Sequence, residues 1–237
     1  MGVIKFNGLL STDYGIVVEK PPNYIAAEKE CEIVHVPGRN GDVVIEYDSY
    51  QNVNRTYEIA VGEVDADFPS LANGVYEWLH SCRGYARLED DYEPAFYRMA
   101  MYQEESTMTN LLAQAGRATI NFNCKPQRFL VSGETEVSFS SSGSIVNPTN
   151  FYAKPVITVY GSGNGIITVN GYKVEIVNIS SYITIDSEIM DAYTGSTNRN
   201  SAVTLENGFP KLAPGTNALS FSGGVTSIKI KPNWWTL

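Results

Sequence analysis

Two acidic runs are the residues in this 237-residue chain whose types could do chemistry. Asp186-Ser-Glu188 is followed closely by Asp191, and Glu89-Asp-Asp-Tyr-Glu93 forms the second run. Two carboxyl groups hydrolyse a glycosidic bond only when a cleft holds them on opposite sides of the sugar, and neighbours in one loop do not meet that condition. Neither run has the alternating ligands and fixed glycine of a calcium loop. We therefore expect both runs to be solvated loop ends, without catalytic or metal-binding residues.

Histidine and cysteine give no stronger signal for a reactive site. His35 and His80 are the only histidines, and neither lies near a cysteine pair that would suggest zinc. No nucleophile-elbow sequence supports a Ser-His-Asp triad. Cys31, Cys82 and Cys124 are odd in number and widely spaced, which indicates no disulfide framework, and we expect three reduced core residues. These observations predict a protein that is not an enzyme and needs no cofactor.

Aromatic residues in the second half of the chain leave one binding function open. Trp234 and Trp235 are adjacent, and further aromatics on nearby predicted strands are Tyr152, Tyr172, Tyr182 and Tyr193. Such residues can stack against sugars, although on short strands they more often fill a core or seal an interface. Trp234 and Trp235 are thus candidates for contact with a glycan or a partner, and a carbohydrate-binding module is the alternative function.

Charge is distributed unequally along the chain. Residues 1–132 hold 11 Lys and Arg against 19 Asp and Glu, a net charge of −8, whereas residues 133–237 hold 6 against 7, a net charge of −1. Specific binding of nucleic acid requires clustered Lys and Arg that neutralise phosphates, so this class of function is disfavoured. An acidic wall can instead let a polyanion pass without adhesion.

The N-terminus predicts where the protein is made, and the middle of the sequence predicts a division into two domains. The N-terminus has no charged leader followed by an apolar run, and no stretch approaches a membrane span, so we expect synthesis in the cytoplasm without a signal peptide. The segment 121–133 alternates as a strand until Pro126, and Ser132-Gly133 then releases the chain. We place the domains at 1–132 and 133–237.

The first domain is predicted to be mainly β, with one helix and one long hairpin. Two β-type runs, 33–36 and 43–47, flank a turn-like segment in which Asn40-Gly41 is a hairpin signal. The segment 67–82 has a possible cap at Asp67, a proline in the first turn and apolar residues at three- and four-residue steps, which predicts an amphipathic helix. The segment 106–115 gives no clear pattern and is expected to be irregular.

The second domain is predicted to be an antiparallel β-sandwich. Short β-type runs alternate with turn residues at regular spacing, which is typical of sandwiches. The expected strands cover 137–139, 156–160, 165–169, 172–177, 182–186, 218–221 and 227–231.

Several of these segments, in this order, resemble the distal tail proteins of long-tailed, non-contractile bacteriophages (siphoviruses). The resemblance covers about 115 residues and rests on these segments of the sequence: Phe122-Asn-Cys-Lys-Pro-Gln-Arg-Phe129, Ala153-Lys-Pro-Val-Ile-Thr-Val-Tyr-Gly161, Ile167-Thr-Val-Asn-Gly171, Ile185-Asp-Ser-Glu188, Phe209-Pro-Lys-Leu-Ala-Pro-Gly-Thr-Asn217 and Ile230-Lys-Pro-Asn-Trp-Trp235. The first half matches less sharply. The resemblance implies a tail-tube-like first domain that closes into a hexameric ring, and a galectin-like second domain.

The resemblance also implies where the protein works and with which partners. It places the protein in the virion, as a hub at the tail tip that joins the tube to the baseplate or adsorption apparatus and leaves a channel for DNA. The implied partners are the tail tube protein, the tape-measure protein, a tail-associated or fibre protein, and a receptor-binding protein. The hairpin around Arg39, Asn40, Gly41 and Asp42 would be the belt that embraces the next subunit. In the alternative function, the second domain would recognise host cell-wall glycans.

Overall fold

The chain folds into two compact units in a computed structural model that describes residues 1–62, 67–103 and 116–237. One unit comprises residues 1–128 with Leu237, and the other comprises residues 129–236. The division falls four residues before the boundary expected from the sequence, because Phe129 to Ser132 lie with the second unit. No helix in the described ranges is long and apolar enough to cross a membrane.

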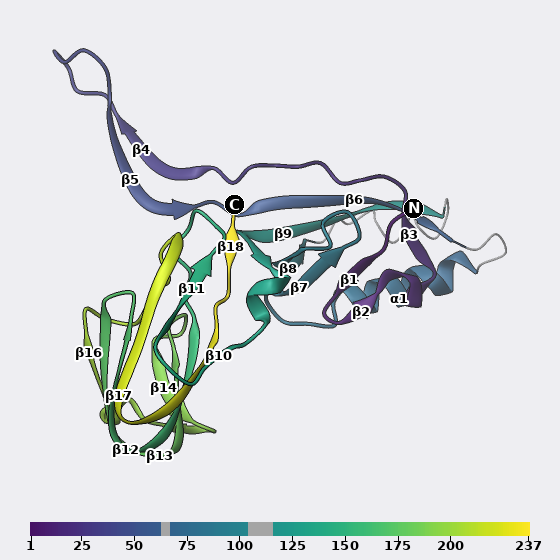
Figure 1. The fold of residues 1–237 in the computed structure, drawn as a ribbon. Coiled ribbons are helices and arrows are strands. Elements are labelled where there is room, and N and C mark those ends of the chain that lie inside the picture. The colour runs from purple at the N-terminus through teal and green to yellow at the C-terminus, as the bar shows by residue number, and fades with distance from the viewer. Residues whose placement is uncertain (63–66, 104–115) are drawn as a thin grey trace. The chain divides into compact units, whose positions relative to one another are not determined.

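The first unit is built on a mixed-length sheet that Figure 1 shows in purple to teal. Its strands follow the spatial order β2-β1-β7-β8-β9-β6-β3. The pairs β1–β7, β7–β8, β6–β9 and β3–β6 are antiparallel, and β6–β9 has the long register, from Val53 opposite Cys124 to Ala60 opposite Arg117. The strands are β1 (Ile4–Phe6), β2 (Leu9–Leu10), β3 (Ile16–Val18), β6 (Val53–Val61), β7 (Ala86–Asp90), β8 (Phe96–Gln103) and β9 (Arg117–Leu130). A 3-10 turn, η1 (Ser11–Tyr14), connects β2 to β3.

The predicted helix is confirmed as α1 (Phe68–Leu79), the one α-helix of the described residues. Its apolar stripe includes Val75 and Trp78, which are buried against the sheet. The Trp78 indole N–H donates to the carbonyl of Phe6 at 3.2 Å and so ties the helix to β1. Asp67 occupies the N-cap position, but its side chain makes no capping hydrogen bond there, and Pro69 near the first turn fits the helix start.

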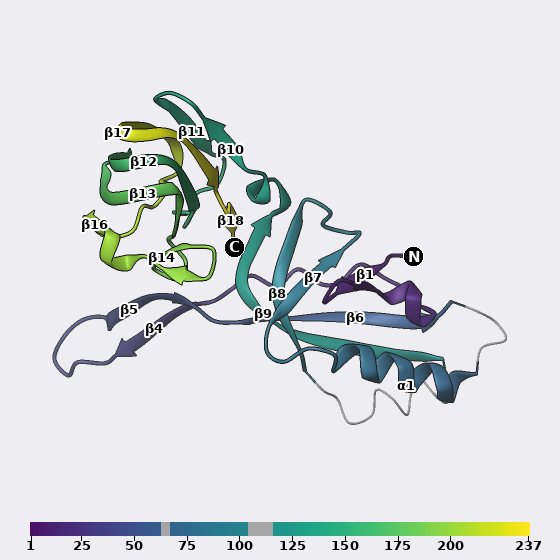
Figure 2. The ribbon, with the colours of Figure 1, turned by 90° about the horizontal axis from the view of Figure 1, so that it is seen from below.

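A long hairpin of β4 (Lys29–Val34) and β5 (Val43–Tyr50) forms a two-stranded sheet of its own. Figure 2 shows it extending from the start of β6, away from α1. The hairpin that the sequence predicted is confirmed, with a connection of eight residues, 35–42, that contains the Asn40-Gly41 pair. Within it the chain turns at Pro37-Gly38, where the Arg39 N–H donates to the Val36 carbonyl at 3.2 Å and Gly38 has a φ of +83°. Pro then Gly at these positions is typical of a type II turn.

The second unit is the expected sandwich, but its long strands each run through both layers. The runs predicted as six strands form three, β12 (Val156–Val169), β13 (Tyr172–Asp186) and β17 (Gly215–Lys231), which bend together where the register shifts around Gly161–Gly165. The two halves of the bent sheet enclose a core that contains Ile157, Ile167 and Ile228. Shorter strands complete the layers: β10 (Val137–Phe139), β11 (Gly143–Asn147), β14 (Asp191–Thr194), β15 (Thr197–Asn198) and β16 (Val203–Glu206). The last strand, β18 (Trp235–Thr236), pairs with β9 and is not part of this sheet.

Two further expectations differ from the structure or fall outside it. Strand β9 does not stop at Pro126 but continues to Leu130. Its register with β6 ends at Cys124, so the missing N–H of Pro126 removes no hydrogen bond on that side. Strand β11 begins inside a Ser- and Gly-rich stretch, residues 140–144, and is not among the strands predicted from the sequence. The irregular segment expected at 106–115 lies outside the described residues.

Candidate assembly interface

The hairpin exposes apolar side chains on both of its faces. Ile33 pairs with Val44 on one face, where the two residues are 66% and 55% exposed. Ile45, with Tyr47 two residues further, lies on the opposite face, and these are 44% and 53% exposed. An isolated two-stranded hairpin is marginally stable in water, and large exposed apolar patches mark interaction sites. The hairpin therefore has the composition of an element completed by a partner.

The predicted belt residues lie together in the loop that connects β4 to β5. Gly41 has a φ of +79°, which a side chain would strain, and Gly38 and Gly41 both face open space. Nδ1 of His35 lies 2.9 Å from Oδ1 of Asp42, so this pair closes the base of the loop. Arg39 and Asn40 are exposed in the turn. The loop thus exposes the Arg39 guanidinium on a turn whose backbone conformation depends on Gly38 and Gly41.

The shaft of the hairpin is acidic. Residues 28–50 hold six Asp and Glu against two Lys and Arg, a net charge of −4, which is half of the −8 carried by residues 1–132. Lys29 pairs with Glu46 across the strands, and the Tyr47 hydroxyl donates to Glu32 at 2.9 Å. Because the hairpin takes much of the acidic surplus, the charge excess does not by itself identify the wall of a channel.

The open face of the β6–β9 pair is polar and nearly free of net charge. Asn54 and Thr56 of β6 lie opposite Asn123 and Asn121 of β9, and the Thr56 hydroxyl donates to Asn121 at 2.6 Å. Glu58 follows on the same strand, with Lys20 at 2.7 Å from its carboxylate. This face offers uncharged amides and hydroxyls.

A buried ion network lies near the start of β6, where the hairpin joins the sheet. Arg55 is 2% exposed and contacts Asp90 and Glu93, each at 2.9 Å. Glu93 also contacts Arg98 at 3.4 Å and Arg128 at 2.7 Å. The Arg55 guanidinium carbon also lies 5.3 Å from the centre of the Tyr24 ring, on the segment that leads into the hairpin. The run 89–93, expected to be a solvated loop, therefore supplies the carboxylates of this network.

Trp234 and Trp235 lie in the second unit in settings that differ from a sugar platform. Trp234 is 5% exposed and belongs to the core. Trp235 is half-buried, stacks on Phe151 with ring centres 4.5 Å apart, and donates its indole N–H to the Tyr152 carbonyl at 3.0 Å. Both side chains are occupied in holding the unit together, so no observation favours the glycan-binding alternative.

The carboxylates of the other acidic run, 186–191, stabilise the local loop structure. Asp186 accepts the backbone N–H groups of Glu188 and Ile189, and Asp191 accepts the side-chain amides of Asn198 and Asn200. In the described ranges, no group of three or more His, Cys, Asp or Glu is arranged to hold a metal ion.

The three cysteines are free thiols, but they are not all core residues. Cys31 lies exposed on the hairpin, contrary to expectation, because both faces of β4 are open. Cys124 is buried in β9, and burial raises the pKa of its thiol to about 11. Cys31 stands between Glu30 and Glu32 on a strand that is uncovered in a single chain.

Comparison with known proteins bears on this arrangement of two β units and a projecting hairpin. Neither a protein-family profile nor a curated protein sequence matches the chain. Among solved structures, the fold is that of the SPP1 Dit protein (gp 19.1), with a TM-score of 0.73, 14% sequence identity and full coverage of both chains. That protein is described as a paradigm of the hub of the adsorption apparatus in phages that infect Gram-positive bacteria. The expected resemblance to a phage distal tail protein is confirmed at the level of the fold.

A chain of the phage P2 baseplate in its activated conformation with calcium also matches. It has a TM-score of 0.48 and 10% identity over 99% of both chains. This similarity is too low to support a conclusion about the fold.

Proposed function

We propose that this protein is a structural hub of a phage tail tip, in which copies of the chain join through the hairpin into a ring, with six copies as the expected number. The observation that carries the proposal is the pair of uncovered apolar faces on β4 and β5. The full-length likeness of the fold to the SPP1 Dit hub supports it. A head-to-tail contact between identical chains closes into a ring when the rotation permits. The ring would leave a channel for DNA and connect the tail tube to the adsorption apparatus.

The partners proposed for such a hub follow from its position in the tail. The tail tube and tape-measure proteins would meet it on the tube side, and a fibre or receptor-binding protein on the other side. The proposed function needs no catalytic residue, since a hub acts by assembling with itself and by joining other tail proteins.

Polar replacement of the hairpin's apolar pair tests the assembly. We expect mass photometry to show particles of six 26.1 kDa chains for the wild type. Ile33→Ser with Val44→Ser should shift the population to single chains, because the replaced surface no longer gains by leaving water. The matched control is Ile189→Ser with Met190→Ser, since these residues of the second unit are 62% and 67% exposed but lie outside the hairpin. A wild type that stays monomeric at micromolar concentration, or an equal effect of both double variants, would contradict the proposal.

A further inference from the structure

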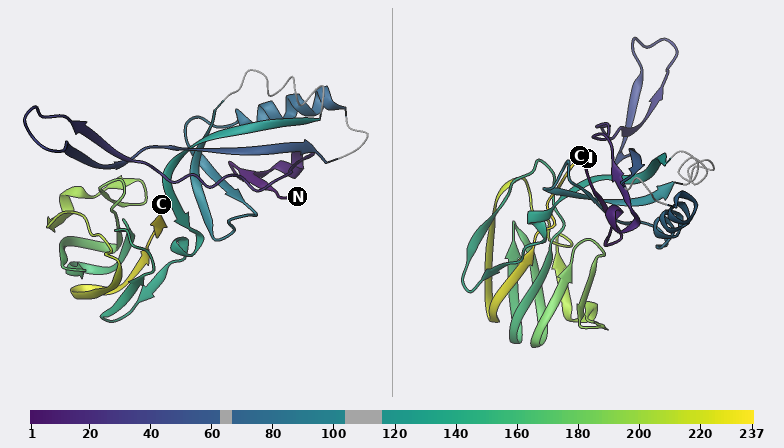
Figure 3. Two further views of the ribbon diagram at one scale, coloured as in Figure 1. Left: turned by 90° about the horizontal axis from the view of Figure 1, so that it is seen from above. Right: turned by 90° about the vertical axis from the view of Figure 1, so that its right-hand side faces the viewer.

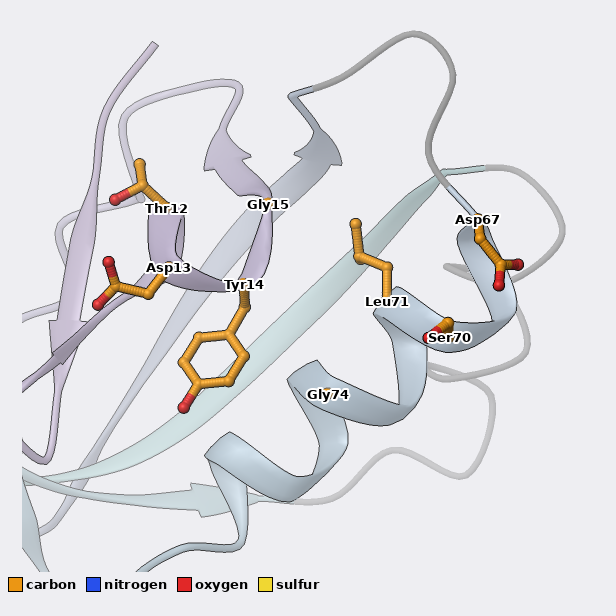
Figure 4. Close-up of a pocket in the computed structure, with 8 residues that line it drawn as sticks. All are labelled: Thr12, Asp13, Tyr14, Gly15, Asp67, Ser70, Leu71 and Gly74. Carbon is orange, nitrogen blue, oxygen red and sulfur yellow. The ribbon is translucent and has the colours of Figure 1, made fainter.

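A groove of about 460 Å³ lies between η1 and the first turns of α1. Figure 4 shows Asp13 and Tyr14 on the η1 side and Asp67, Ser70 and Leu71 on the helix side. Gly15 has a φ of +68°, and a Cβ there would lie 2.9 Å from the Leu71 side chain, so glycine lets the backbone pass close to the groove. The groove combines an apolar wall with carboxylates and hydroxyls.

The two carboxylates of the groove have no cationic partner in the described part of the chain. Asp13 accepts the Leu10 backbone N–H at 3.1 Å with one oxygen, and both Asp13 and Asp67 are exposed. Carboxylates and hydroxyl groups that line one groove without a cationic partner favour a positively charged side chain, and a guanidinium can donate to more than one of them. The groove therefore suits an arginine from outside the chain.

Arg39 at the hairpin tip is a cation with the complementary properties. It is exposed, and within the described ranges it forms no ion pair. The neighbouring Asp42 is held by His35 at 2.9 Å. The carboxylates Glu46 and Glu32 of the shaft have contacts of their own, with Lys29 and with the Tyr47 hydroxyl.

The hairpin and the groove lie at opposite ends of strand β6. The hairpin enters β6 at Val53, while Val61 at the other end of β6 pairs with Ile16 beside the groove. The Gly62 N–H donates to the Gly15 carbonyl at 2.8 Å and fixes the groove rim to that end. Nine strand residues separate the ends by about 30 Å. Figure 3 shows the hairpin and α1 on opposite sides in its left view.

From these four observations we infer that Arg39 of one copy enters the groove of the next, which Asp13 and Asp67 line on opposite sides. This inference rests on the proposed function and specifies the surface that the hairpin tip meets. A donor at one end and an acceptor at the other make the contact head-to-tail, which is the type of contact that builds rings. Tyr14 and Leu71 supply apolar wall for the aliphatic stem of the arginine.

A charge reversal with rescue tests the pairing. Arg39→Glu should raise the concentration at which half of the chains are assembled by about tenfold or more, because attraction becomes repulsion at each contact. Asp67→Arg alone should weaken assembly in the same direction. The combined variant Arg39→Glu with Asp67→Arg should recover most of the loss. Analytical ultracentrifugation over a concentration series measures these midpoints.

The matched control is Arg83→Glu, which reverses another exposed arginine that forms no ion pair among the described residues. It should leave the assembly midpoint unchanged. If the wild type never assembles, both the proposed function and this inference are overturned. If the wild type assembles and Arg39→Glu behaves like Arg83→Glu, or if the combined variant shows no recovery, the groove is overturned while the hub stands. Unchanged melting temperatures would show that the exposed substitutions leave folding intact.

Discussion

Glu93 is the residue whose contacts reach furthest through the first unit. Its carboxylate contacts Arg55, Arg98 and Arg128, from β6, β8 and β9. Asp90 supplies the second carboxylate and accepts the Tyr57 hydroxyl at 2.6 Å, and burial together with Asp90 raises the pKa of Tyr57 well above its ordinary value. Taking these charges out of water is costly, so each depends on its partners. The network fixes the strands at the root of the hairpin.

Glu93→Gln should therefore destabilise the first unit strongly. The substitution keeps the shape but leaves three guanidiniums with one carboxylate, and breaking a buried pair in this way costs about 3–5 kcal/mol. Urea denaturation followed by fluorescence measures the change in the free energy of unfolding. Glu58→Gln is the control, because the Glu58–Lys20 pair at 2.7 Å is exposed and such surface pairs contribute little. Equal effects of the two variants would refute the role given to the network.

At the scale of elements, the second unit has a crease, the bend of β12, β13 and β17 around Gly161–Gly165. The crease depends on glycines where the backbones of β12 and β17 approach closely. A Cβ on Gly161 would lie 2.1 Å from the Gly224 carbonyl oxygen, and one on Gly224 would lie 1.7 Å from the Ser162 carbonyl oxygen. Backbone atoms cannot move aside as the end of a side chain can. The close approach lets β12 and β17 bend together and place their two halves in opposite layers of the sandwich.

Gly224→Ala should accordingly lower the free energy of unfolding of the second unit by about 3 kcal/mol or more. Gly163→Ala is the matched control in the same crease. Its φ is +75° but a Cβ would meet nothing within 4 Å, so only the backbone strain of about 1 kcal/mol remains. Thermal unfolding by circular dichroism compares the two. A loss for Gly163→Ala as large as that for Gly224→Ala would mean that backbone strain, not crowding, governs the crease.

These elements also show how far the sequence could predict the fold. Local patterns identified α1, the hairpin and the strands of the sandwich, because apolar periodicity and turn residues are local signals. They could not distinguish a glycine crease from a turn, so β12 was divided in two. The carboxylates of the run 89–93 were assigned to solvent because Arg55 and Arg128 lie more than 30 residues away, and spacing does not show that folding brings them together.

For the whole molecule, each unit has its own core, and the apolar hairpin belongs to the first. The buried clusters of the two units share no residue, and the second contains Ile157, Val174 and Ile230 among others. A domain with its own core can fold alone, and a chain of about 100 residues is an ordinary size for one. Charge and composition led us to expect a boundary at 132–133, whereas the candidate interface required the exposure of the hairpin to be seen.

The fragment 129–236 should therefore fold by itself and remain monomeric, while the full chain assembles. Its strands pair among themselves, and Leu130 donates its N–H to the Trp234 carbonyl at 2.9 Å, which joins the two ends of the fragment. We expect a cooperative thermal transition for the fragment and a single-chain mass at concentrations where the full chain forms rings, since the fragment lacks both hairpin and groove. Circular dichroism and analytical ultracentrifugation measure the two properties. A fragment that assembles as readily as the full chain would move the interface to the sandwich, and the hairpin would then lose its proposed role.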